Sequence, residues 1–499
     1  MLAFQKVENA LKRARELQDI GNETAALHVL YSTIMNNRFR AQGWDSVKEQ
    51  VMMRFVQFCV EKEKLKYVRD GLYQYRTISH HSNIASLGKV ITELRDRAES
   101  RLKAAKMTLG IKEMEKGKMD GDLEAEESPE SLILCTLQID VRDPAARAVH
   151  TPLRFVWETY KMIMDILKFS PKMEKLYHET ARRACYFCSE NERPMEFKRL
   201  CDGLRQNYAL LLKYKSKQES EALLRPELHL ETRIAQLNVA SELGLWRESA
   251  NTAEDICTLG IHELFMKSFR LKADPSYKLR EKLLKWLAVY YEKLSMIFWV
   301  SDNYLFHALA WIKYLLHVKN FKKNVAAADL EGLCNTAVLA VLAIPTNFGD
   351  KKQDALDVDS TTTLESQKKM TNLLGHPTIP SRDILKYALS HRDIISRSSD
   401  VYQKLYGLLE TEFTPLKLCS ECQPLLEQLE NSSNAKYVTA LKRIIFHKLI
   451  VQLSKVFTSV TIEYFTTQIC PNDFFEWEDV RFCVFEGVVM KFCFIISVK

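Results

Sequence analysis

Glycine and proline are scarce in this chain of 499 residues, at 15 and 13 residues respectively. Collagen repeats and low-complexity disordered segments depend on abundant glycine or proline, so both classes are excluded. Hydrophobic residues make up 46% of the chain and charged residues 27%, which is the balance of a helix-rich globular protein. The sequence therefore predicts an all-α fold, built either as about two to four domains or as one extended helical array.

The chain also lacks a long apolar run and a strong excess of one charge. A membrane span needs about 18 or more apolar residues, and the nearest candidate, residues 482–498, contains Glu486 and Lys491. Lys and Arg number 71 against 64 Asp and Glu, a net charge of +7, which permits contact with nucleic acid without requiring it. With 12 cysteines and no secretory leader pattern at residues 1–10, we expect free thiols and a cytoplasmic location.

Apolar residues recur at helical spacing along most of the chain. Leu11, Ala14 and Leu17 form one stripe, Asp19–Asn22 supply a turn, and residues 26–34 carry a second stripe. This pattern is typical of paired antiparallel helices. Because the period of such pairs varies, we predict an irregular right-handed solenoid of tetratricopeptide-like helix pairs. Further helices are expected at residues 51–59, 68–78, 89–107, 155–167, 176–187, 197–213, 228–243, 246–259, 277–300, 304–318, 381–390, 399–413, 415–429 and 435–457.

Several segments interrupt this pattern. Residues 110–130 are polar and acidic and carry no apolar stripe, which predicts an exposed linker. Thr151 and Pro152 then predict the start of a helix, with Thr as its N-cap and Pro at its first position. Residues 347–369 form a second polar break. Residues 481–499 are rich in Phe, Val, Ile and Cys without a helical period, and they predict one or two β-strands.

Two Cys-x-x-Cys pairs are the first candidates for metal or redox chemistry. Cys185/Cys188 and Cys419/Cys422 lie more than two hundred residues apart, whereas the two halves of a zinc ribbon are separated by about 15 to 20 residues. Both pairs also fall inside helical patterns, where thiols at i and i+3 are ordinary core or surface residues. Neither pair is therefore predicted to hold a metal.

Motifs of known enzyme classes are incomplete. His262–Glu263 begin like a zincin helix, but Met266 stands where the second histidine ligand belongs. The glycines and the lysine of residues 110–118 have the wrong spacing for a phosphate-binding loop. His80–His81 have no Cys or carboxylate partner at ligand spacing. We therefore predict that the chain is not an enzyme and has no catalytic, cofactor-binding or metal-binding residues.

Clusters of lysine are better candidates for function. Lysines gathered at the ends of helices on one edge of a solenoid can contact phosphates in a salt-sensitive, sequence-independent way. The alternative is that they only make exposed turns soluble. The candidate RNA-contact residues are Lys213, Lys215, Lys217, Lys319, Lys322 and Lys323.

An ordered set of short segments carries a family resemblance over roughly residues 2–480. The set resembles eIF3a, the largest subunit of eukaryotic translation initiation factor 3. No single segment would suffice, but all of them occur in the order of the family. The segments are 8–14, 71–75, 197–202, 229–233, 297–299 and 412–419.

The resemblance implies stacked helices that end in a PCI module, a helical bundle capped by a winged helix. It also implies a non-enzymatic scaffold that binds other subunits of the factor, the PCI partner eIF3c above all, together with the small ribosomal subunit, its rRNA and mRNA. A PCI subunit of the proteasome lid or signalosome is the alternative within the same architecture. The expected segments are N-terminal helical hairpins at 1–108, an acidic linker at 109–131, a helical-repeat solenoid at 132–318, a PCI module at 319–480 and an atypical apolar tail at 481–499.

The sequence departs from the family near its end. Residues 460–468 look like the first helix of the winged helix and residues 474–480 like the beginning of the second, but residues 481–499 do not continue the pattern. The winged helix is therefore expected to be incomplete. Our hypothesis is a short isoform or a gene model that reads past an exon boundary.

Overall fold

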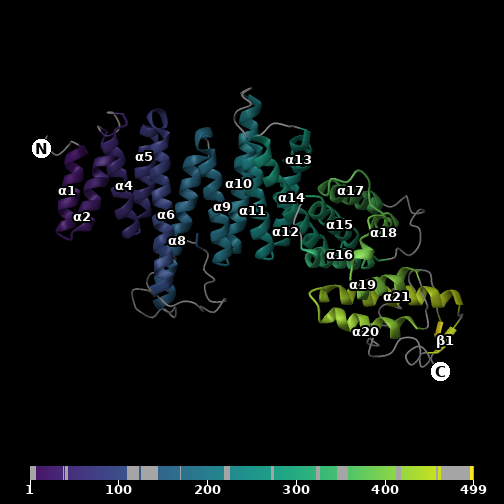
Figure 1. The fold of residues 1–499 in the computed structure, drawn as a ribbon. Helices are drawn as coiled ribbons and strands as arrows, with labels where there is room; N and C mark the ends of the chain where they lie inside the picture. Colours follow the sequence, from purple (N-terminus) through teal and green to yellow (C-terminus); the bar gives the residue numbers. More distant parts are fainter. Residues whose placement is uncertain are drawn as a thin grey trace. The chain divides into compact units, whose positions relative to one another are not determined.

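The structure is a computed structural model whose described residues are almost entirely helical (Figure 1). The chain divides into two compact units, Met1–Leu245 and Trp246–Lys499. The finer division into five segments stays a prediction. The structure describes residues 7–37, 39, 43–108, 123–124, 144–168, 170–217, 225–270, 275–321, 326–345, 358–411, 417–456, 459–461 and 495–497.

The first unit is a row of helices in which each helix packs against its neighbours in the chain (Figure 1). This is the helical solenoid that the apolar stripes predict. Its elements are α1 (Val7–Asp19), α2 (Glu23–Met35), α4 (Ser46–Glu61), α5 (Leu65–Ser82), α6 (Ile84–Thr108), α8 (Pro144–Leu167), the 3-10 turn η2 (Pro171–Met173), α9 (Glu174–Glu190), α10 (Pro194–Lys217) and α11 (Pro226–Glu242).

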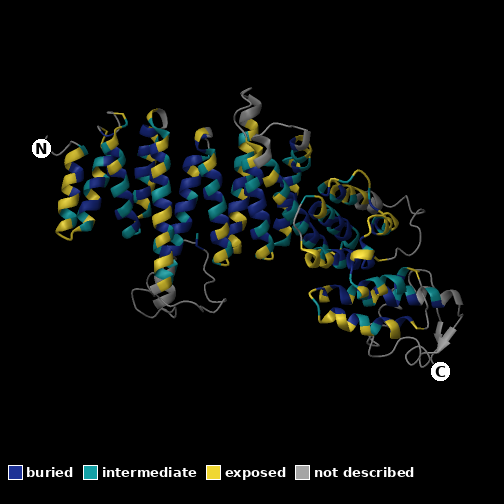
Figure 2. Ribbon diagram, viewed as in Figure 1, coloured by how far each residue is buried: buried dark blue, intermediate teal, exposed yellow. Residues whose placement is uncertain are grey.

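A continuous apolar core runs through the first unit, and Figure 2 shows its buried residues on the faces that neighbouring helices share. Val51, Phe55 and Phe58 of α4 are fully buried, because their spacing places them on one side of the helix. Gly71 of α5 lies directly against Phe55. A Cβ atom at Gly71 would lie 2.5 Å from Phe55 Cε1, so the absence of a side chain allows α4 and α5 to approach closely.

The predicted turn between the first two helices is confirmed. Gly21 adopts a φ of 84°, and Asn22 caps α2 by accepting a hydrogen bond from the Ala25 N–H at 3.2 Å. The predicted helix start at Thr151 is wrong, since α8 begins at Pro144 and Pro152 lies inside it. An internal proline removes one backbone hydrogen bond, but the burial of Leu153 on the same turn helps to offset that loss.

The second unit is a further set of packed helices, among which α14, α15 and α16 contact one another in sequence. Its helical elements are α12 (Trp246–Thr258), α13 (Ile261–Arg270), α14 (Pro275–Val300), α15 (Tyr304–Phe321), α16 (Ala327–Leu342), α17 (Val358–Leu373), α18 (Arg382–His391), the 3-10 turn η4 (Ile395–Arg397), α19 (Asp400–Tyr406), the π-helical turn η5 (Gly407–Thr411), α20 (Leu418–Glu430), the 3-10 turn η6 (Ala435–Tyr437) and α21 (Val438–Val456).

Three helices of the second unit escape the sequence pattern. α16 is buried without interruption from Thr336 to Ile344, so it has no polar face to reveal a helical period. α17 lies in the predicted polar break, which is therefore wrong from Val358 onward. The cause is tertiary packing: α17 contacts α12, and Thr371 at its end is buried. α13 is short, and it packs against α14.

Two short strands pair near the end of the chain. β1 (Ser459–Thr461) and β2 (Ile495–Ser497) run parallel, with Val460 opposite Ile496. β2 confirms a strand in the apolar tail. The helix predicted from Val460 is wrong over its first two residues, because β-branched Val and Thr favour the extended backbone. Residues 462–494, which include the second predicted winged-helix element, lie outside the described residues.

None of the helices that the structure describes has the length and the apolar character needed to cross a bilayer.

Candidate interaction surfaces

The lysines predicted to contact RNA lie in both units. Lys213 is exposed near the end of α10, and the helix continues through Lys215 and Lys217. Lys319 is exposed in the last turn of α15, whereas residues 322–323 lie outside the described part of the chain. The partial negative charge at a helix C-terminus stabilises nearby cations, which gives both clusters a structural reason as well. RNA contact therefore stays a prediction.

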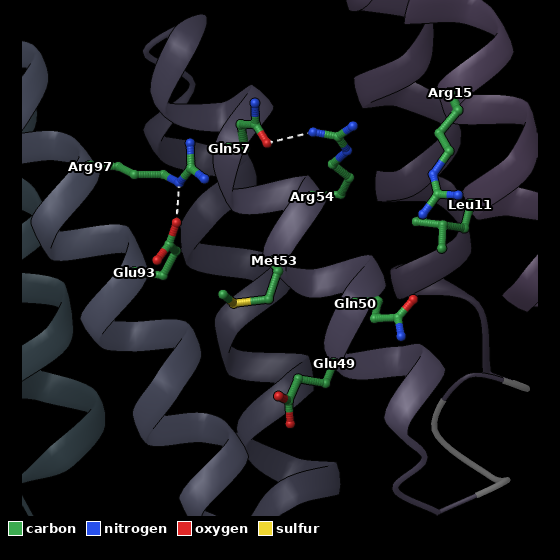
Figure 3. A pocket seen from close by; sticks show the side chains of 9 residues that line it. All are labelled: Leu11, Arg15, Glu49, Gln50, Met53, Arg54, Gln57, Glu93 and Arg97. Atoms are coloured by element: carbon green, nitrogen blue, oxygen red, sulfur yellow. Dashed lines mark hydrogen bonds and ion pairs between the residues drawn. The ribbon is translucent and has the colours of Figure 1, made fainter.

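A surface groove of about 310 Å³ lies between α1, α4 and α6 (Figure 3). Arg15 comes from α1, Arg54 from α4 and Arg97 from α6, so three arginines that are distant in sequence line one hollow. Leu11 and Met53 supply apolar surface in the same groove. The sequence pattern did not indicate this site, because each arginine reads alone as an exposed residue of an amphipathic helix.

Two of these arginines are held by neighbours on their own helices (Figure 3). Arg54 Nη1 donates a hydrogen bond to Gln57 Oε1 at 2.8 Å, and Arg97 forms an i,i+4 ion pair with Glu93. Glu49 also lines the groove. The carboxylates only partly offset the arginines, so the groove keeps an excess of positive charge and offers guanidinium groups suited to phosphate or carboxylate ligands.

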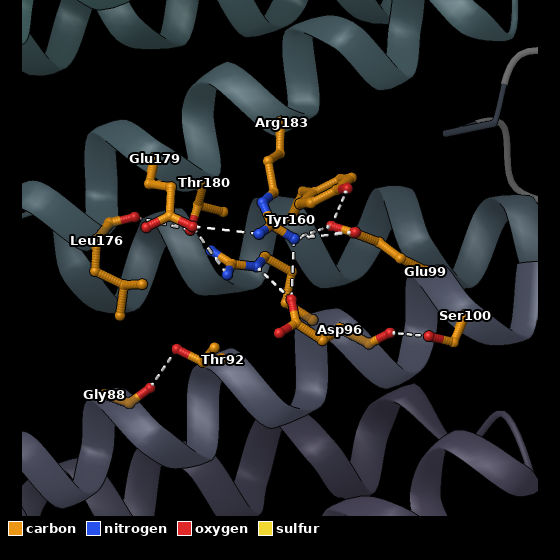
Figure 4. Close-up of polar contacts among 11 residues, drawn as sticks. Gly88, Thr92, Asp96, Glu99, Ser100, Tyr160, Leu176, Glu179, Thr180 and Arg183 are labelled. Atoms are coloured by element: carbon orange, nitrogen blue, oxygen red, sulfur yellow. Dashed lines mark hydrogen bonds and ion pairs between the residues drawn. The ribbon is translucent and has the colours of Figure 1, made fainter.

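A network of buried and half-buried charges joins α6, α8 and α9 (Figure 4). Arg183 of α9 lies 2.9 Å from Asp96 Oδ1, 3.1 Å from Glu99 Oε2 and 3.4 Å from Glu179 Oε1. Tyr160 of α8 donates a hydrogen bond to Glu99 Oε1 at 2.8 Å. These contacts connect side chains of three helices, which indicates a structural role.

Arg95 of α6 belongs to the same network, and its side chain is only 2% exposed. Its Nε atom lies 3.2 Å from Asp96 Oδ1, and its Nη2 atom lies 3.1 Å from Glu179 Oε1. A guanidinium buried to this degree is stable only when it is paired. The carboxylates of Asp96 and Glu179 therefore hold α6 and α9 together.

Two residues of the predicted exposed linker are docked against the first unit. Leu123 is fully buried, and its N–H donates a hydrogen bond to Glu196 Oε1 at 3.0 Å. Glu124 accepts a hydrogen bond from Trp157 Nε1 at 3.0 Å and lies 3.2 Å from Lys161 Nζ. The expectation of an exposed linker is therefore wrong at these two positions. An isolated leucine between acidic residues escapes a search for stripes, yet it gains apolar burial while its neighbour pairs with a cation.

An acidic residue of the second unit is surrounded by cations. Glu410 of the π-helical turn η5 lies 2.6 Å from Arg382 Nη2, 2.5 Å from Lys386 Nζ and 2.7 Å from Lys448 Nζ. Burial alone would raise the pKa of Glu410, but hydrogen bonds from the two lysines and the nearby charge of Arg382 lower it to about 2. The carboxylate thus stays charged and joins α18, η5 and α21.

The cysteine pairs behave as the sequence predicts. Cys185 and Cys188 are buried in α9, and Cys419 and Cys422 are buried in α20. Burial raises the pKa of Cys185, and it raises the pKa of Cys422 to about 12. Because metals and redox partners react with the thiolate, these protonated thiols are ordinary core residues.

Three residues brought together by α9 and α11 could hold a metal ion. The ligand atoms of Glu174, His178 and His229 all lie within 4.8 Å of one another. The Nε2 atoms of both histidines are buried without a hydrogen-bond partner in the described structure, which costs about 1–3 kcal/mol for each such atom. Sequence reasoning missed this cluster because the two histidines belong to different helices.

A family model described as "eIF3a, PCI domain, TPR-like region" matches residues 8–417. The chain belongs to this family. Proteins named as the eIF3a component of eukaryotic translation initiation factor 3 are similar over nearly all of it. The Arabidopsis thaliana relative is 34% identical over 96% of this chain and 49% of its own length. Those of Aspergillus oryzae and Aspergillus fumigatus are 35% and 36% identical over 92% of this chain, and over 45% and 44% of their own lengths.

The chain thus spans about half the length of the curated eIF3a relatives that it matches. Among solved structures, a circular tandem repeat protein is 8% identical with a TM-score of 0.30, which is too distant to inform the fold. The resemblance inferred from the ordered segments is confirmed, and the alternative of a proteasome-lid or signalosome subunit is not favoured. The eIF3a segments that carried it lie on several helices of both units, including α1, α5 and α11.

Proposed function

We propose that this chain is a non-enzymatic scaffold subunit of the cytoplasmic eukaryotic translation initiation factor 3 complex. In this role it binds the small ribosomal subunit together with other subunits of the factor, and it supports the recruitment of mRNA. The observation that carries the proposal is the eIF3a family match over residues 8–417. A row of stacked helices supports it, because such stacks present long ridges and grooves to protein and RNA partners.

The PCI protein eIF3c is the first partner that we expect among the other subunits. PCI subunits are expected to pair through the edges of their winged-helix sheets, a form of β-augmentation in which backbone hydrogen bonds provide the affinity. The groove between α1, α4 and α6 offers a second mode of contact, since its arginines suit acidic or phosphate-bearing partners.

A pull-down of the tagged chain followed by mass spectrometry tests the proposal. Recovery of initiation factor 3 subunits together with proteins of the small ribosomal subunit is the expected result. Recovery of proteasome-lid or signalosome subunits with neither of these groups would favour the alternative scaffold and contradict the proposal.

Charge reversal tests the predicted RNA contact at Lys213, Lys215 and Lys217. Replacing all three by Glu should weaken binding to small ribosomal subunits by on the order of 10-fold or more and reduce the dependence on salt by about two ions. Lys66→Glu together with Lys103→Glu is the matched control, because both lysines are exposed on other helices of the first unit. Unchanged affinity and salt dependence in the triple variant would remove this cluster from the RNA interface.

A further inference from the structure

We propose that Glu174, His178 and His229 bind one Zn²⁺ ion between α9 and α11. Each residue offers one ligand atom, and the three atoms lie within 4.8 Å of one another. Glu174 and His178 are four residues apart on α9 and therefore share a face, while α11 packs against α9 and supplies His229. Two imidazoles and one carboxylate with a fourth position left for water are a common set of zinc ligands.

Hydrogen bonds place the proton of His178 where a metal ligand needs it. Thr232 Oγ1 donates to the carbonyl oxygen of Leu228 at 3.1 Å, so its hydroxyl proton is already used. The same oxygen lies 2.9 Å from His178 Nδ1 and must accept a hydrogen bond from it. His178 therefore carries its proton on Nδ1 and presents the lone pair of Nε2. Zinc-binding histidines are commonly oriented by such a second hydrogen bond.

The lone pairs that would bind the ion are buried without a hydrogen-bond donor. His178 is 2% exposed and His229 is 7% exposed, and neither Nε2 atom has a partner among the residues that the structure describes. His229 Nε2 lies 3.7 Å from Glu174 Oε1, which is too long for a hydrogen bond. Buried polar atoms are rarely left unsatisfied, and one cation between these atoms would satisfy all of them.

The charge state of the cluster is compatible with a metal. Burial lowers the pKa of His178 to about 2 and that of His229 to about 4, so both rings are neutral at pH 7, as ligands must be. Arg182 and Arg225 are close by, but Arg182 pairs with Glu231 at 3.5 Å. Because these arginines repel a cation, we expect weaker binding than at sites built from thiolates.

Zn²⁺ is the ion that this set of donors favours, because imidazole and carboxylate ligands together suit a cation of borderline softness. The nearest competitors are Cys185 and Cys188 on the same helix. Their burial raises the pKa of both thiols, so neither provides a thiolate at neutral pH.

The first test uses the full chain, purified and stripped of metal with EDTA. We expect it to take up one Zn²⁺ ion per chain, measured by mass spectrometry of the metal after dialysis. Co²⁺ in place of Zn²⁺ should give the visible spectrum of a four- or five-coordinate site of nitrogen and oxygen ligands. A strong near-ultraviolet charge-transfer band from thiolate to Co²⁺ would assign the ion to cysteine and overturn the proposal.

The second test uses variants of the cluster. Glu174→Gln and His229→Gln should each weaken Zn²⁺ binding by about 100-fold or more, and Thr232→Val should weaken it by about 10- to 100-fold through the loss of the contact to His178. His28→Gln is the control, because His28 is exposed on α2. Circular dichroism checks that each variant folds. Wild-type affinity in both ligand variants would overturn the proposal, and the Co²⁺ spectrum of the unaltered chain decides it independently of any variant.

Discussion

Removing the charge of Glu410 is expected to loosen the second unit at the junction of α18, η5 and α21. The pKa of Glu410 falls from its ordinary value of 4.5 to about 2, despite burial, because Lys386, Lys448 and Arg382 surround the carboxylate. This difference corresponds to about 3 kcal/mol of stabilisation of the charged form in the folded chain. Glu410→Gln keeps the shape of the side chain but leaves three cations around a neutral amide.

Hydrogen–deuterium exchange followed by mass spectrometry measures this loss locally. At pH 7, amides of α18 and α21 should exchange on the order of 100-fold faster in Glu410→Gln, while those of α4 and α9 should not change. Glu427→Gln on the exposed face of α20 is the matched control. A change of less than about threefold in α18 and α21, or an equal change in the control, would refute the assignment of about 3 kcal/mol to this cluster.

The same cluster predicts a pH dependence with a definite sign. Because the folded pKa lies below the unfolded value, the stabilisation is complete above about pH 4.5 and is lost as the pH falls toward 2. Protection of α18 and α21 in the wild-type chain should therefore fall across this range, after correction for the intrinsic exchange rate. In Glu410→Gln this contribution should be absent, and an identical pH profile in both chains would contradict the explanation.

Two substitutions in the first unit test its packing. Gly71→Ala places a Cβ atom 2.5 Å from Phe55 Cε1 and should cost about 1–3 kcal/mol, seen as a lower midpoint of thermal unfolding, whereas Gly203→Ala, where nothing lies within 4 Å, should not lower it. An equal effect at both glycines would show that helix propensity and not crowding is measured. Leu123→Ala should cost about 2–5 kcal/mol by the same assay, because the side chain is fully buried, and exposed Met107→Ala should cost almost nothing. An unchanged midpoint in Leu123→Ala would show that this contact contributes little to stability.

The fold could be predicted wherever one face of a helix is apolar and the other is polar. The pair of α1 and α2 is such a case, since Leu11 and Ala14 are buried while the residues between them are exposed. The turn at Gly21 is equally visible, because its positive φ favours glycine. Local spacing and local backbone preference are sufficient in these segments.

Prediction fails where tertiary contacts override local pattern. α16 is buried on every side from Thr336 to Ile344, so no stripe marks it. Pro152 looks like a helix start, but the helix runs through it from Pro144. The cluster of Glu174, His178 and His229 depends on the packing of α9 against α11, which spacing along the chain does not encode.

Buried ion pairs explain how a stack of similar helices keeps one register. Apolar contacts alone tolerate shifts, because leucine, valine and isoleucine substitute for one another with small losses. Sliding α9 along α6 by one turn, about 5.4 Å, would part Arg183 from Glu99 and leave Arg95, only 2% exposed, without Glu179. An unpaired buried charge of this kind costs on the order of 3–5 kcal/mol. The charges at this junction therefore select the observed arrangement over shifted ones, a discrimination that the apolar core cannot supply by itself.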